Sequence, residues 1–212
     1  MTSTLIDKIY KSRKNVLDIM SNQEYDVSEY GEFSINEVNI MFNTTQLDML
    51  LKRKDINDPK ITNNLYICYH LYKILRPQNV DNIIEDLFIT NNILEKKDTL
   101  FIIVKDDIND TLTNYLKQLW ATEKILVVVV KMEELLFNIL NHELVPPHRI
   151  MSKSETDSLK LRFGIKDNSE MPDISRFDPV AKVICMRPND VCEIKRKSKT
   201  GITGLYYRVC LN

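Results

Sequence analysis

The sequence is poor in the residues that build catalytic centres, disulfide frameworks and tight turns. Its 212 residues include three histidines, four cysteines, four glycines, two alanines and one tryptophan. The cysteines show no close pairing along the chain, and each lies in an apolar stretch. We therefore expect buried, reduced thiols rather than disulfides or a metal site. The histidines are dispersed and lie in no recognisable nucleophile motif, so no catalytic residue, metal or cofactor is expected.

The distribution of charged and apolar residues along the sequence predicts neither a signal peptide nor a membrane span. The first 20 residues carry charges throughout, and the longest aliphatic run, residues 125–130, is too short to cross a bilayer. We expect an intracellular protein with no membrane partner. The net charge of −1 is uneven, at −5 over residues 1–141 and +4 over residues 142–212. Any contact with nucleic acid should therefore be local.

Residues 1–141 predict an α/β domain. An apolar stripe from Leu5 to Met20 predicts a long amphipathic helix, and the capping-box spacing of Ser34 and Glu37 predicts a second helix to about residue 42. Two nearly continuous apolar runs joined by a helix predict a parallel pair of strands with both faces covered. The runs are 100–104 and 125–130, and a further strand and a further helix are predicted at 65–72 and 133–140.

Residues 142–212 predict a second, small α+β domain. Pro146 and Pro147 both fix φ and lack an amide hydrogen, which places the boundary before them. A capping box begins a helix that should end at Gly164, and Asp178 followed by Pro179 begins a short one. Residues 191–196 and 205–211 predict a hairpin. A unit of about 70 residues buries little surface, so it should depend on a partner.

Several spaced motifs of the C-terminal part follow one another in a fixed order. They resemble the assembly domain of the fifth subunit of eukaryotic nuclear RNA polymerases, a domain that forms the whole of the corresponding archaeal subunit. The motif residues, which form the candidate assembly site, are Leu144, Val145, Pro146, His148, Pro172, Asp178, Pro179, Val180, Ala181, Ser198, Thr200, Gly201, Tyr207 and Arg208.

The resemblance extends upstream. Arg13-Lys14-x-Val16-Leu17 and Tyr25-x-Val27-Ser28 resemble the start of the eukaryotic subunit's N-terminal domain, which the archaeal form lacks. It implies a non-catalytic polymerase subunit with the largest subunit as main partner and other polymerase subunits as neighbours. It also implies that residues 1–141 form a "jaw" near downstream DNA, similar to a restriction-endonuclease core without its catalytic residues.

The loop of Asn109, Asp110 and Thr111 stands where the family has a Thr-Pro-Ser turn close to downstream DNA. The loop has no proline and carries a carboxylate. Because phosphates repel carboxylates, we expect any DNA contact here to be weak.

Composition suggests a source. The chain has 24 isoleucines, 20 lysines and 19 asparagines, which is typical of AT-rich coding. A large nucleocytoplasmic DNA virus or an AT-rich protist would fit, and we rank the virus first, with the protein in the virion and the host-cell cytoplasm. A cellular version would be nuclear.

Three interpretations compete with the polymerase subunit. A metal-dependent nuclease would use Glu193-x-Lys195 with Asp190, but the two carboxylates should point to opposite faces of one strand. A cation loop at Asp106, Asp107 and Asp110 lacks the spacing of known calcium loops. A free-standing adaptor would use the assembly fold outside a polymerase. The basic run 195–199 could also bind nucleic acid.

Overall fold

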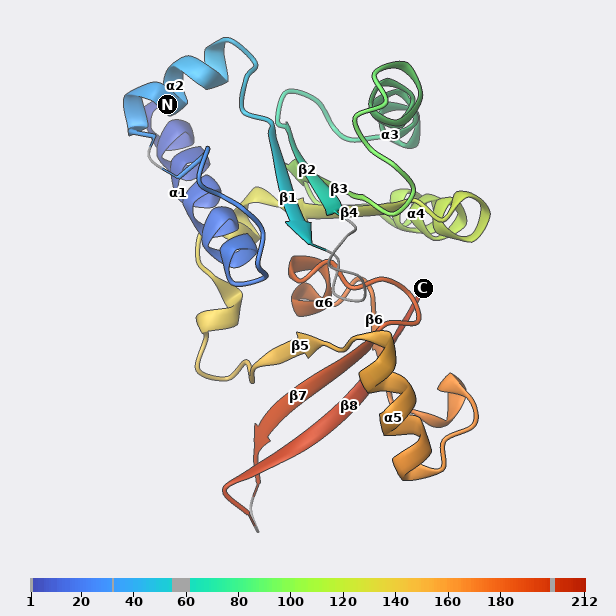
Figure 1. The fold of residues 1–212 in the computed structure, drawn as a ribbon. Coiled ribbons are helices and arrows are strands. Elements are labelled where there is room, and N and C mark those ends of the chain that lie inside the picture. Colours follow the sequence, from blue (N-terminus) through green and yellow to red (C-terminus); the bar gives the residue numbers. More distant parts are fainter. Residues whose placement is uncertain (1, 32, 55–61, 199–200) are drawn as a thin grey trace. The chain divides into compact units, whose positions relative to one another are not determined.

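The computed structural model of the chain describes residues 2–31, 33–54, 62–198 and 201–212 (Figure 1). The chain divides into two compact units that meet in sequence at Asn138 and Ile139, three residues before the predicted boundary. Among the described residues, no helix combines the length and the apolar character that crossing a membrane requires.

The N-terminal unit is built on a four-stranded sheet in the order β1-β2-β3-β4. β1 (Met49–Lys54) pairs antiparallel with β2 (Thr62–His70), whereas β3 (Thr99–Val104) pairs parallel with β2 and with β4 (Leu126–Lys131). Every residue of β3 is buried, as expected for a strand covered on both faces. The predicted parallel pair is confirmed.

Helices flank this sheet on both sides (Figure 1). α1 (Thr2–Ser21) and α2 (Ile35–Asn43) lie on one side, and α3 (Pro77–Ile84) and α4 (Asp110–Glu123) lie on the other. α3 continues as the π-helix η1 (Glu85–Thr90). The predicted capping box at Ser34 is present, and Asn109 caps α4 by accepting a hydrogen bond from the amide of Leu112.

The helix predicted at residues 133–140 is wrong. The segment forms two short 3₁₀ turns instead, η2 (Met132–Leu135) and η3 (Ile139–Asn141). The Leu135 carbonyl accepts a hydrogen bond from Asn15 of α1 at 2.8 Å, and the buried Asn138 side chain donates to Asp18 at 2.6 Å. The bond from Asn15 occupies a backbone carbonyl that an α-helix would have used within itself, and the Asn138 side chain ties the segment to α1 as well.

The C-terminal unit is built on a second sheet in the order β5-β7-β8-β6. β7 (Val191–Lys197) and β8 (Thr203–Leu211) form the predicted antiparallel hairpin, and the three-residue strands β5 (His148–Ile150) and β6 (Asp173–Ser175) flank it. α5 (Lys153–Phe163), the 3₁₀ turn η4 (Asn168–Glu170) and α6 (Pro179–Val183) complete the unit. α5 begins at the predicted capping box and ends at Gly164, as predicted.

Each face of the second sheet has its own apolar core. Ala181 and Ile184 of the α6 region pack on Cys192, Ile194 and Cys210. On the other face, Leu159 of α5 packs with strand residues Val191 and Val209. The hairpin continues beyond both helices, and its far part is not covered by either (Figure 1).

Most of the described residues with a left-handed backbone conformation are not glycines. Gly164 (φ 68°) is the one glycine with positive φ in the described part of the chain. Six other described residues share this conformation, and they are Glu24, Thr45, Asn92, Lys124, Cys185 and Asn189.

Candidate functional site

The predicted motif residues that the structure describes are distributed over the C-terminal unit, and His148 and Asp178 lie at β5 and at the start of α6. His148 is the first residue of β5 and lies opposite Ile194 of β7. Its ring nitrogen Nδ1 lies 2.6 Å from the carbonyl oxygen of Pro146. Burial lowers the pKa of His148, and the nearby charge of Asp178 opposes this effect. Two motif residues far apart in sequence therefore lie within electrostatic range of each other.

Asp178 begins α6. Its Oδ1 accepts hydrogen bonds from the amides of Val180 at 2.9 Å and Ala181 at 3.4 Å, while Pro179 occupies the first turn. Val180 and Ala181 are buried, and Ala181 is fully so. This motif therefore fixes a short helix against the sheet, which accounts for its residue types without any chemistry.

The residues before β5 form an exposed strap. The side chain of Leu144 is 84% exposed, whereas the amide of Val145 donates to the carbonyl of His142. Pro172 lies just before β6 and is exposed, and its carbonyl accepts the amide hydrogen of Val209 at 2.9 Å.

The hairpin holds the last group of motif residues. The Ser198 hydroxyl accepts a hydrogen bond from the amide of Gly201, and the ring of Tyr207 meets that of Phe163 at 6.2 Å between centroids. Arg208 donates to the carbonyl of Asp173. Thr200 lies outside the described residues. The structure thus places these residues in one unit, and their role in assembly stays a prediction.

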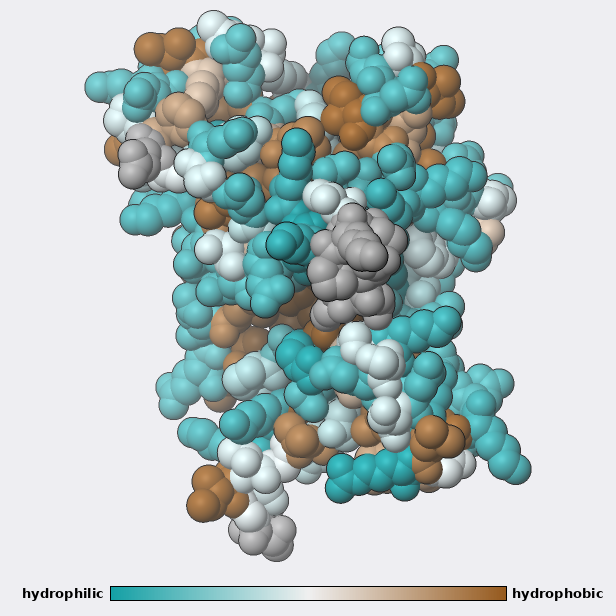
Figure 2. Space-filling view, viewed as in Figure 1, coloured by the Kyte–Doolittle hydropathy of each residue, from teal (hydrophilic) through white to brown (hydrophobic). Residues whose placement is uncertain are grey.

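The part of the hairpin that lies beyond α5 and α6 has a basic and apolar surface. Lys195, Arg196 and Lys197 are exposed, and the guanidinium of Arg196 lies 5.4 Å from the ring centroid of Tyr206. Ile202 is 94% exposed. Apolar surface is visible toward the end of the hairpin (Figure 2). Such a surface suits binding to another molecule rather than a reaction.

Arg149 is a central residue that the sequence patterns did not single out. It donates to both carboxylate oxygens of Glu155, at 2.9 and 3.1 Å, and lies 3.3 Å from Glu193. It therefore ties β5 to α5 and β7. These contacts raise the pKa of Arg149, chiefly through the hydrogen bond to Glu155. Its position three residues before the capping serine was the one local signal.

The same contacts count against the nuclease alternative. Glu193 is paired with Arg149, and Asp190 accepts the amide hydrogen of Arg187 at 2.9 Å. No group of three or more potential metal ligands occurs within the residues that the structure describes. The carboxylates thus serve local structure.

The acidic loop after β3 is also engaged locally. Asp107 lies 2.8 Å from the ammonium of Lys131, which also contacts Glu133 at 3.4 Å. Asp110 occupies the first turn of α4, where the helix dipole favours a carboxylate. Asn109, Asp110 and Thr111 are all exposed. The loop is therefore accessible, but its charge is negative.

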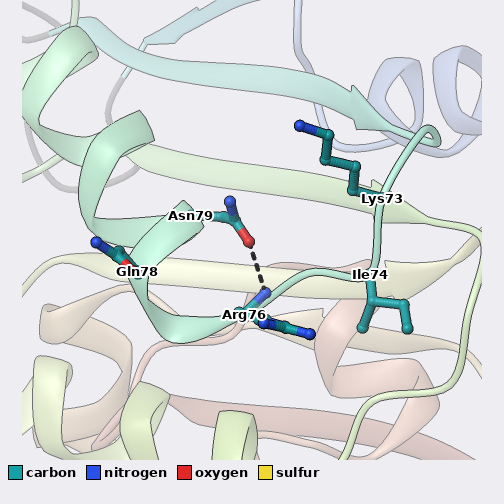
Figure 3. Close-up of a pocket in the computed structure, with 5 residues that line it drawn as sticks. All are labelled: Lys73, Ile74, Arg76, Gln78 and Asn79. Atoms are coloured by element: carbon teal, nitrogen blue, oxygen red, sulfur yellow. Dashed lines mark hydrogen bonds between the residues drawn. The ribbon is translucent and has the colours of Figure 1, made fainter.

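A hollow lies close by, at the carboxyl ends of the parallel strands. His70, Val104 and Lys131 end β2, β3 and β4 in register. The chain after β2 lines a cavity of about 470 Å³ at the start of α3 (Figure 3). Its lining residues are Lys73, Ile74, Arg76, Gln78 and Asn79, and the Asn79 side chain accepts the Arg76 amide hydrogen at 3.1 Å.

All four cysteines are free, and Cys185, Cys192 and Cys210 are buried. Burial raises the pKa of Cys192 to about 11 and that of Cys210 to about 12. The raised pKa values disfavour the reactive thiolates of Cys192 and Cys210, and three of the four cysteines are buried as expected, whereas Cys68 is half-buried.

Comparison with known proteins adds independent information. Residues 137–210 match the family model described as RNA polymerase Rpb5, C-terminal domain. Over 73 residues the chain is 47% identical to DNA-directed RNA polymerase subunit Rpo5 of Thermococcus celer, covering 34% of this chain and 88% of that protein. Over 209 residues it is 27% identical to subunit rpabc1 of DNA-directed RNA polymerases I, II, and III of Dictyostelium discoideum, covering 97% of this chain and 98% of that protein.

Proposed function

Because this chain belongs to the family of the fifth subunit of DNA-directed RNA polymerases, whose members are non-catalytic subunits, we propose that its C-terminal unit anchors it to the largest polymerase subunit. The observation that carries this proposal is the location of the family match, which falls at residues 137–210 and so on the C-terminal unit. The 73 residues shared with the archaeal subunit cover 88% of that protein. A unit with so small a core gains stability from a permanent interface.

Crosslinking within the purified polymerase tests the anchor. A tagged chain is recovered from its native source at moderate salt, treated with an amine-reactive crosslinker and analysed by mass spectrometry. We expect Lys195 and Lys197 to crosslink to the largest subunit. Lys8 and Lys117 of the N-terminal unit serve as comparison sites, and recovery of the chain without polymerase subunits would contradict the proposal.

The same proposal assigns the N-terminal unit to a jaw with a restriction-endonuclease-like core. A mixed sheet with a parallel pair covered on both faces supports it. The jaw contacts downstream DNA at the carboxyl ends of its parallel strands. Lys73 and Arg76 are exposed there and could neutralise phosphates, whereas Asp110 would repel them.

Salt dependence of DNA binding tests the jaw. Polymerase carrying Lys73→Gln and Arg76→Gln should lose two phosphate contacts, which reduces the slope of log affinity against log salt by roughly 1.8. Asp110→Asn is the matched control and should strengthen binding at low salt. Fluorescence anisotropy with a downstream duplex measures both variants. An unchanged slope in the double variant would remove DNA contact from this edge.

The source and location also belong to the proposal. The excess of isoleucine, lysine and asparagine supports an AT-rich genome, and we place the protein in a large nucleocytoplasmic DNA virus. It would then act inside the host cell, in the cytoplasm and the virion. Mass spectrometry of the co-purified large subunits identifies the genome that encodes them, and host-encoded subunits from a nuclear fraction would refute a viral source.

A further inference from the structure

Strand β8 has an open edge. β6 pairs only with Val209, Cys210 and Leu211, although β8 begins at Thr203. β7 occupies the other side of β8 along its length. Among the described residues, no strand therefore pairs with the outer side of β8 between Thr203 and Tyr207.

The backbone direction at this edge follows from the hydrogen bonds at the end of β8. The amide of Cys210 donates toward β7, to the carbonyl of Asp190, and the amide of Val209 donates toward β6, to the carbonyl of Pro172. Because successive residues of a strand point their amides to alternate sides, Leu205 and Tyr207 direct theirs to the same side as Val209. Both residues thus present an amide and a carbonyl to the open edge.

Pro172 explains why pairing stops where it does. By the register of β6 with β8, residue 172 is the one that would donate to the carbonyl of Tyr207. A proline has no amide hydrogen, so this bond cannot form. Pro172, one of the motif residues, therefore leaves the outer edge of β8 open at Tyr207.

The side chains beside the edge indicate the chemistry of a partner. Leu205 is 54% exposed, and it lies opposite Lys195, just as Thr203 lies opposite Lys197. Lys195 and Lys197 are exposed and form no ion pair among the described residues. These residues share one face of the sheet, so a partner strand should place on that face an apolar residue beside Leu205 and acidic residues for the two lysines.

We propose that an extended, acidic segment of the largest polymerase subunit adds to the open edge of β8 as a fifth strand. Its backbone pairs with Leu205 and Tyr207, and its carboxylates on this face attract Lys195 and Lys197, whose long side chains belong to β7 on the other side of β8. Backbone pairing supplies the affinity in this mode of recognition, and the side chains supply the specificity. The inference rests on the proposed function, because it names the contact through which the C-terminal unit is anchored. It also explains why an exposed edge with apolar character is tolerated.

Amide exchange tests the added strand. In the free full chain, the amides of Leu205 and Tyr207 should exchange rapidly, whereas those of Tyr206 and Arg208 are protected by pairing with β7. In the purified polymerase, the first two amides should slow by at least about tenfold, and the other two serve as internal controls. Mass spectrometry with fragmentation by electron transfer resolves these adjacent positions.

Variants give a second measurement. Leu205→Pro removes the outward amide, and Leu205→Ala keeps it while removing the side chain. We expect the proline variant to reduce recovery of tagged chain with polymerase at least about tenfold, and the alanine variant to reduce it much less. Circular dichroism of the free proline variant shows whether it is folded. If it is unfolded, the amide-exchange measurement alone decides whether the strand is added.

The outcomes separate the two claims. Rapid exchange of Leu205 and Tyr207 in a polymerase that contains the chain refutes strand addition and leaves the anchoring role intact. Failure of the unmodified chain to purify with any polymerase subunit refutes the proposed function itself.

Discussion

Removal of the Asp178 cap should destabilise the C-terminal unit selectively. Asp178→Ala deletes the acceptor for two amides, at 2.9 and 3.4 Å, at the start of a helix of five residues. Loss of a helix cap costs about 0.5–2 kcal/mol. Ala181 is fully buried and water cannot reach its amide, so we expect a loss above the low end of this range, at about 1–2 kcal/mol.

The expected change is large enough to measure. For a unit of about 70 residues, 1 kcal/mol shifts the melting temperature by roughly 4–8 °C. Urea titration followed by amide signals in two-dimensional NMR reports each unit separately. Signals of Leu51 and Phe101 in the N-terminal unit should keep their midpoint, because the substitution lies outside that unit.

Asp178→Asn is the matched control. Asparagine caps a helix as well as aspartate does, so stability should stay within about 0.5 kcal/mol of the unmodified chain. The charge is lost, however, and the pKa of His148 should fall further, because the Asp178 charge currently raises it. An alanine variant with an unchanged midpoint, or an asparagine variant as unstable as alanine, would refute the capping argument.

Three further predictions concern the same unit. Burial lowers the pKa of His148, so the unfolded chain binds a proton more readily than the folded one. The unit should therefore lose stability as pH falls below about 6.5, and a pH series of denaturation curves should be flatter for His148→Gln. Gly164→Ala should cost about 1 kcal/mol in urea denaturation, since φ is 68° and a Cβ would meet no atom within 4 Å, and an equal stability would show that the left-handed cap is not needed. Cys192 and Cys210 should react with a maleimide only at the rate of opening, and burst labelling of the folded chain would contradict their burial.

The sequence predicted the helices whose ends are marked by capping residues, proline or glycine. The capping boxes at Ser34 and Ser152, the aspartate-proline pair before α6 and the glycine after α5 all mark helix ends in the structure. Each of these is decided by hydrogen bonds within four residues, so neighbouring residues carry the information.

Elements decided by distant contacts could not be predicted. The segment after β4 has a helical pattern, but hydrogen bonds to α1 some 120 residues away divide it into 3₁₀ turns. The three-residue strands β5 and β6 exist only because the hairpin accepts them. The predicted strand at 65–72 also ends two residues early, at His70, and Tyr72 is 64% exposed and stacks on Phe42.

The candidate site was predicted in part for the same reason. The motif residues could be named from the sequence, but the role of Arg149 depends on β5, α5 and β7 meeting in space. The open edge of β8 depends on strand order, which no local pattern encodes. The sequence therefore predicted which residues belong to the candidate site, but the contacts of Arg149 and the open edge of β8 could be seen only in the three-dimensional structure.

Because glycine is scarce, several residues with a Cβ adopt a left-handed backbone conformation, and substitutions at these positions could raise the free energy of unfolding. Left-handed backbone costs a residue with a Cβ roughly 1–2 kcal/mol, and the chain bears this strain at Thr45, Lys124 and Cys185, among others. Lys124 ends α4 at the position where glycine is most often found. Glycine at two or three of these positions would relieve strain without touching either sheet. A chain that bears such strain lies below its highest attainable stability, so variants with a higher free energy of unfolding should be obtainable.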